Sequence, residues 1–73
     1  MSAEPYYEIT RIRMISPGNV RLTLLGKDLN ANEALKAVRY AVNNGIPEDE
    51  IEITEHICEI DSISVEELND RAS

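Results

Sequence analysis

Two segments near the N-terminus alternate between apolar and polar residues as a β-hairpin requires. Residues 6–15, YYEITRIRMI, are rich in the β-branched and aromatic residues that favour strands. Residues 19–25, NVRLTLL, alternate, with Val20, Leu22 and Leu24 on one face and Arg21 and Thr23 on the other. Between them, Pro17 and Gly18 suit the central positions of a type II turn, because proline presets φ and glycine tolerates a positive φ. The pattern therefore predicts an antiparallel hairpin.

Residues 30–44, NANEALKAVRYAVNN, have the spacing of an amphipathic helix. Asn30 is a suitable N-cap, and Glu33 stands where a capping box needs a carboxylate. Gly45 fits the left-handed position after the helix, and Pro47 prevents its continuation. The apolar stripe is rich in small residues, so the helix is expected to cover the hairpin closely. Its members are Ala31, Ala34, Leu35, Val38, Ala41 and Val42.

A third strand is predicted over about residues 50–60, but its apolar positions change phase. One face receives Ile51, Ile53 and Ile57, and the other receives Cys58 and Ile60. The first strand shows a similar change between Ile9 and Ile12. Either both strands contain a bulge or both faces of the sheet are partly covered.

The tail after this strand predicts a short final helix. Ser64 can cap it, and Glu67 stands at the matching capping-box position. Val65 and Leu68 are the two apolar residues available to anchor it.

The resulting order, β-β-α-β followed by a short helix, places the chain in the α+β class. A right-handed crossover makes the third strand parallel to the second, which is simplest if it pairs with the first strand. We therefore expect a three-stranded antiparallel or mixed sheet in the order 2-1-3, with the long helix on one face. Residues 1–73 are expected to form one domain, with a flexible start over 1–5 and a frayed end over 70–73.

The length changes this picture by limiting the core. A chain of 73 residues buries little surface, and such small domains often need a disulfide, a metal or self-association. Cys58 is the single cysteine, which excludes an internal disulfide and suits a reducing compartment. The N-terminal residues lack the pattern of a secretory signal, and no apolar run approaches a membrane span. The expected location is the cytoplasm.

The net charge of −7 is distributed unevenly along the chain. Residues 1–47 hold six bases and four acids, whereas residues 48–73 hold ten acids and Arg71 as the single base. Pairing of the third strand with the first predicts cross-strand ion pairs between acids at 52, 55 and 59 and bases at 11 and 13. The named pairs would join Glu52, Glu55 and Glu59 to Arg11 and Arg13.

The remaining acids predict a surface for a basic partner protein and argue against direct binding to nucleic acid or membranes. If that partner normally binds nucleic acid, acids on alternate strand positions, about 6.6–6.8 Å apart, would replace phosphates and inhibit it. The candidate partner-binding residues are Glu48, Asp49, Glu50, Glu52, Glu55, Glu59, Asp61, Glu66 and Glu67.

The chain contains few groups that suggest chemistry. His56 and Cys58 fall on one face of a strand, but a zinc site needs three or four ligands, which a second copy would have to complete. The same pair lacks the orienting group and pocket that a thiol nucleophile requires. The acids at 48–50 lack the calcium-loop spacing. We therefore expect no catalytic residue, no metal site, no cofactor and no enzymatic activity.

In size, acidity and sheet-plus-helix plan, the chain resembles the small phage-encoded inhibitors of bacterial defence, which include anti-CRISPR proteins. That resemblance implies a phage protein that blocks a defence machine, and it transfers no site residue. The alternative is a homo-oligomer, for example a homodimer, that associates through sheet edges or faces and binds a small ligand or metal between copies.

Overall fold

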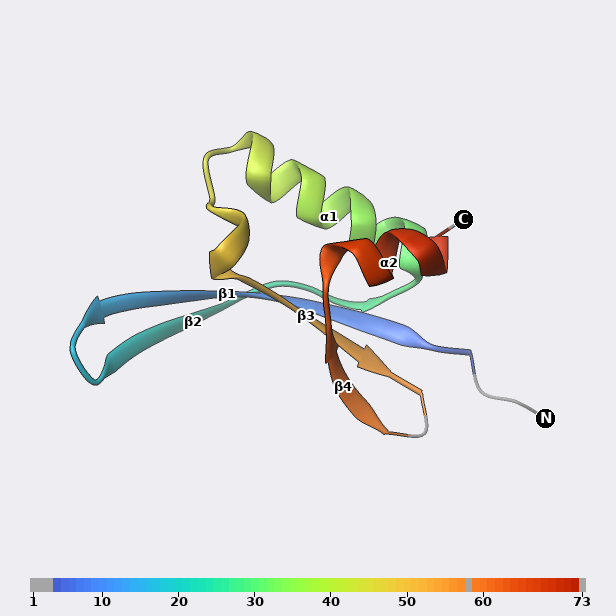
Figure 1. Cartoon of the computed structure of the whole chain (residues 1–73), viewed down its shortest axis with the longest axis horizontal. Coiled ribbons are helices and arrows are strands. Elements are labelled where there is room, and N and C mark those ends of the chain that lie inside the picture. The colour runs from blue at the N-terminus through green and yellow to red at the C-terminus, as the bar shows by residue number, and fades with distance from the viewer. Residues whose placement is uncertain (1–3, 58, 73) are drawn as a thin grey trace.

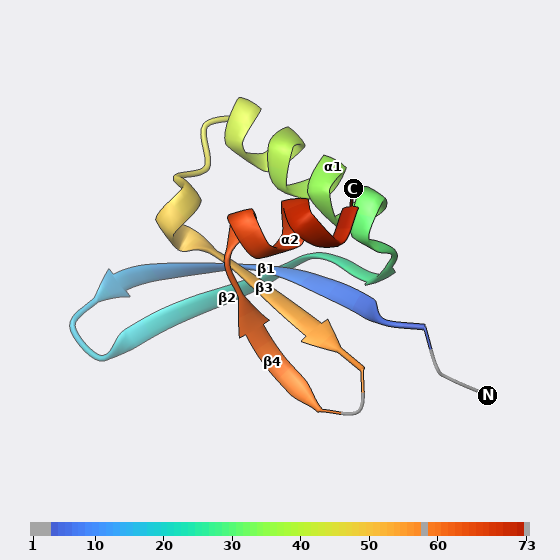
Figure 2. The same ribbon diagram turned by 45° about the vertical axis from the view of Figure 1, so that its right-hand side comes forward.

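The computed structural model describes residues 4–57 and 59–72 (Figure 1). Its elements are β1 (Tyr6–Ser16), β2 (Asn19–Leu29), α1 (Ala31–Asn43), a 3₁₀ turn η1 (Glu48–Glu50), β3 (Ile51–His56), β4 (Ile60–Ile63) and α2 (Val65–Ala72). The strands form one antiparallel sheet in the order β2-β1-β3-β4. Both helices lie over the same face of this sheet (Figures 1 and 2).

The α+β class and the two helices are confirmed, but the expectation of three strands is wrong. The segment expected to form one strand over 50–60 reverses direction, because the Ile57 N–H donates to the Glu59 carbonyl at 3.2 Å. Ile57 is therefore in a turn, and Ile60 begins β4, which pairs antiparallel with β3. The change of apolar phase marks this turn rather than a bulge. Cys58, which contributed to that pattern, lies outside the described residues.

The change of phase in β1 has a different origin. Pairing of β1 is regular with β3 from Tyr6 to Arg11 and with β2 from Thr10 to Met14, so β1 itself contains no bulge between Ile9 and Ile12. Ile9 faces the helices and is fully buried, whereas Ile12 lies on the opposite face. The irregularities lie in β2, which has one extra residue between the partners of Tyr7 and Ile9 and a second, Leu25, between the partners of Ile9 and Thr10. This second bulge turns Leu25 toward the core, where it packs.

The core lies between the sheet and the helices. Its fully buried large side chains are Tyr7, Ile9, Ile53 and Leu68. Ala34 and Val38 bring α1 close to the sheet, and Leu68 anchors α2 as its pattern predicted. With so few large side chains, each one carries a substantial share of the stability.

The predicted helix starts are confirmed at both helices. Asn30 Oδ1 accepts a hydrogen bond from the Glu33 N–H at 2.8 Å, and the Asn30 N–H donates to the Glu33 carboxylate Oε1 at 3.0 Å. Ser64 and Glu67 form the same reciprocal pair at 3.1 and 3.2 Å. The two predicted left-handed glycines, Gly18 and Gly45, have φ of 79° and 91°.

The turn end of the β1–β2 hairpin extends past both helices (Figure 1). All residues from 13 to 24 are exposed, and we call residues 12–24 the arm and the rest of the described chain the body. The expectation that α1 covers the hairpin closely holds for the body but not for the arm, where Val20, Leu22 and Leu24 are exposed. These residues pair with Met14, Ile12 and Thr10, on the face of the sheet that is turned away from the helices. We call this the open face.

Within the described residues, no helix combines the length and the apolar character that crossing a membrane requires.

Candidate functional site

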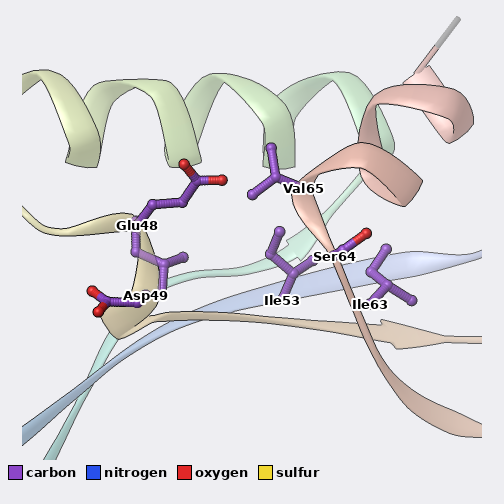
Figure 3. A pocket seen from close by; sticks show the side chains of 7 residues that line it. Glu48, Asp49, Ile53, Ile63, Ser64 and Val65 are labelled. Atoms are coloured by element: carbon purple, nitrogen blue, oxygen red, sulfur yellow. The ribbon is translucent and has the colours of Figure 1, made fainter.

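A hollow of about 420 Å³ lies where η1, β3, β4 and the start of α2 meet (Figure 3). Its floor is apolar, because it includes Ile53 and Ile63, which are 2% and 9% exposed. Glu48 and Asp49 of η1 form its acidic rim, and Val65 lies opposite them. Figure 3 shows the Glu48 side chain reaching toward α1 and Val65, whereas the Asp49 carboxylate points away from Val65. The hollow thus combines an apolar floor with an inward carboxylate.

A second hollow of about 300 Å³ shares Glu48 and Val65 with the first. Its other lining residues come from the C-terminal half of α1: Val38, Arg39, Val42 and Asn43. The last turn of α1 contains no basic residue, so its carbonyl end adds partial negative charge beside Glu48. Among the described residues, Arg39 is the single base that lines either hollow. Together the two hollows form a groove along α1, with Glu48 between them.

The third acid of η1 is already engaged. The Arg11 Nε donates to Glu50 Oε1 at 3.1 Å, and both side chains are about one-third exposed or less. This contact holds η1 against β1 and so positions Glu48 and Asp49, which precede Glu50 in the same turn. It replaces the pairs expected for Arg11, because Ile51 and not an acid lies opposite Arg11 in β3.

Glu55 was expected to face a partner, but it is 6% exposed. Its Oε2 accepts from the Tyr7 hydroxyl at 2.9 Å and from Arg71 Nε at 3.0 Å. A buried carboxylate requires such partners, since an isolated charge would be strongly destabilising there. Glu55 therefore connects β3 to β1 and to α2 and cannot serve as a contact surface.

This network shifts the protonation of the Tyr7 phenol. Burial, followed by the hydrogen bond to Glu55 and its negative charge, raises the pKa of Tyr7 to about 12. The hydrogen bond to Glu55 also raises the pKa of Arg71 above its ordinary value. Both groups hold their protons at neutral pH, so the donor pattern around Glu55 is fixed.

The other candidate acids are exposed but do not form one row. Glu52 lies on the open face, followed on that face by Thr54. Glu59 and Asp61 lie at the far end of the β3–β4 hairpin. Glu66 and Glu67 belong to the first turn of α2, where Glu67 completes the capping box. The expected line of phosphate-like carboxylates along one strand is therefore not formed.

His56 packs on the open face instead of standing free in solvent. Its ring stacks on Tyr6 with centroids 4.5 Å apart, and its Nε2 lies 3.6 Å from the Glu8 carboxylate. Cys58, its proposed companion, lies outside the described residues. Among residues 4–57 and 59–72, no group of three or more potential metal ligands comes together.

Two parts of this arrangement were missed at the level of sequence, although each had a signal. Glu55 shares the strand parity of Ile51 and Ile53, which places it on the buried face. Arg71 is the single base after residue 47, which marked it as the natural partner of a buried acid. The apolar floor of the hollow had no comparable signal, because Ile63 and Val65 meet Ile53 through the unexpected strand β4.

Comparison with protein-family models, with curated proteins and with solved structures finds no significant match to this chain.

Proposed function

We propose that the chain is a non-catalytic binding protein whose groove beside Glu48 receives a basic side chain of a partner protein. The observation that carries this proposal is the pairing of an apolar floor with an acidic rim in one hollow. Lysine and arginine match such a site, because their long stems pack on apolar surface while the charged head meets a carboxylate. A stem lying on Val65 and Ile63 would direct its head toward Glu48.

Long-range charge supports the same partner. The exposed acids at 49, 59, 61 and 66 surround the body with negative potential, which steers a basic protein toward it. Such steering accelerates association more than it strengthens the final complex, so the groove supplies the specificity. If the basic partner surface normally holds nucleic acid, occupation by this protein inhibits it by competition.

The test uses two variants with equal changes in charge. Glu48→Gln with Asp49→Asn neutralises the groove, and Glu59→Gln with Asp61→Asn neutralises two exposed acids at the β3–β4 turn. Immobilised protein captures partners from lysate of the source cell, a salt gradient elutes them, and the captured protein is then titrated against each variant. We expect the groove variant to weaken binding by about tenfold or more and the turn variant by less than about threefold.

Equal weakening by both variants would contradict the groove and leave a general electrostatic attraction. Retention of full affinity by the groove variant, or capture of no basic protein, would overturn the proposed function. Denaturant unfolding of both variants verifies that neither substitution changes the fold.

The alternative, a homo-oligomeric module that holds a ligand or metal, makes two claims, metal binding and self-association. For metal binding, no group of three potential ligands comes together among the described residues. Self-association is favoured by a separate observation, the exposed apolar side chains of the arm.

A further inference from the structure

The arm exposes an apolar patch that no described residue of the same chain covers. On the open face, β1 and β2 place five apolar side chains together: Ile12, Met14, Val20, Leu22 and Leu24. Leu22 and Met14 are 67% and 71% exposed. A contiguous group of five such side chains is comparable to the largest apolar patches of typical soluble monomers, which are often functional.

The dimensions of the whole chain lead to the same conclusion. Its accessible surface is 5360 Å², whereas a monomer of 8.2 kDa is expected to expose about 4,500 Å². The excess of roughly 800 Å² reflects the extended shape of the molecule, to which the exposed arm contributes. The radius of gyration, 12.6 Å, likewise exceeds the roughly 11 Å of a compact chain of this length.

We propose that the open face of the arm is a homodimer interface, occupied by the same face of a second copy of this chain. The central pair of the patch is Ile12 opposite Leu22, with Thr10 opposite Leu24 on one side and Met14 opposite Val20 on the other. A two-fold axis near that central pair places two such faces together in opposite directions, and Leu22 then contributes from both copies. Stacked sheets of this kind lie about 10 Å apart.

The charges of the chain favour a second copy as the occupant. The open face of the arm contains no charged side chain, so two arms can meet without burying a charge. All 14 acids lie outside residues 9–27, while that segment contains Arg11, Arg13, Arg21 and Lys27. The bases Arg13 and Arg21 pair across the hairpin on the other face of the arm, so the arm brings neither an acid nor a buried base to the contact between two chains of net charge −7.

The dimer also resolves a structural weakness of the monomer. Small domains with thin cores are commonly stabilised by self-association when they lack disulfides. Arm-to-arm packing would add a second apolar layer, independent of the groove on the opposite side of the sheet. The groove beside Glu48 remains accessible, because both helices lie on the face that the dimer leaves free (Figure 2).

The test is sedimentation equilibrium of the full chain from low to high micromolar concentration. We expect a monomer–dimer equilibrium that reaches twice the 8.2 kDa chain mass and that high salt does not weaken. Leu22→Lys should weaken association by at least about tenfold, since each dimer contains two such changes. Tyr40→Lys is the matched control, because Tyr40 is 73% exposed on α1 and should leave association unchanged.

A monomer at every concentration would overturn the proposal. A dimer that survives Leu22→Lys would place the interface elsewhere and overturn it equally. Particles that grow beyond two copies would contradict the closed two-fold arrangement. Thermal unfolding of both variants, followed by circular dichroism, shows that loss of the dimer is not loss of the fold.

Discussion

The body and the arm share the same two strands but differ completely in burial. In the body, Tyr7 and Ile9 of β1 lie under α1 and are at most 1% exposed. In the arm, the next residues of the same strand reach 71% exposure at Met14. The strand continues without interruption from one region to the other. Two things differ: α1 and α2 cover the body alone (Figure 1), and Met14 lies on the open face, which neither helix covers.

This difference teaches that an apolar strand face identifies a surface that must be covered, but not what covers it. Within the chain, two helices cover the side that contains Ile9 and Ile53. The open face of the arm has the same apolar character and no cover from the described residues of its own chain. The cover for the open face of the arm would therefore have to come from another molecule, whereas helices of the same chain cover the body.

The largest expected effect is a difference in stability between alanine substitutions of two isoleucines in β1. Ile9→Ala removes a fully buried side chain and should lower the free energy of unfolding by about 2–5 kcal/mol. Ile15→Ala, in the arm, removes a side chain that is 53% exposed and should cost less than about 1 kcal/mol. Urea denaturation of both variants measures the difference. Equal losses at the two positions would mean that the arm is packed, contrary to the structure.

The next effect depends on pH and belongs to the body. The folded-state pKa of Tyr7, about 12, lies above its ordinary value of 10.0. The corresponding stabilisation is complete below pH 10 and is lost as the pH rises toward 12. By pH 11 the loss in unfolding free energy should be about 1 kcal/mol. Tyr7→Phe should remove this part of the alkaline slope of the unfolding free energy.

The control for this slope is Tyr40→Phe, which alters an exposed tyrosine outside the core. It should keep the wild-type slope. An unchanged slope in Tyr7→Phe would show that the Tyr7 phenol is not protected by the Glu55 network.

The smallest effect compares two serines. Ser64→Ala removes the N-cap of α2, whose hydroxyl accepts from the Glu67 N–H, and should cost about 1 kcal/mol. Ser16→Ala changes an exposed residue at the end of the arm and should stay within about 0.5 kcal/mol. Thermal denaturation compares the two variants. A loss at Ser16 as large as that at Ser64 would contradict the division into a packed body and an exposed arm.

Local signals predicted the helix ends and the strand order of the hairpin and β3. Capping boxes such as Asn30 with Glu33 depend on residues three positions apart, and Gly18 satisfies a φ that few other residues adopt. The order 2-1-3 followed from the handedness of a crossover. Such features depend on few residues at a time, which is why the sequence alone was sufficient.

The features that failed depend on long-range packing. The turn after His56 contains no glycine or proline among its described residues, so the sequence suggested a continuous strand. Alternation placed Val20, Leu22 and Leu24 on one face, but it does not tell which face of the sheet the helices cover, and that is decided by the pairing with β1. The groove was missed for the same reason, since β4 brings Ile63 to Ile53.

The most direct test of an uncovered arm is amide hydrogen exchange, read residue by residue at several protein concentrations. In dilute protein, the amides of residues 12–15 and 20–23 should exchange far faster than those of residues 7–9 and 53–55. Raising the concentration should slow exchange in the arm and leave the body unchanged, because a second copy covers the open face. Arm amides as protected as the body at the lowest concentration would contradict the account.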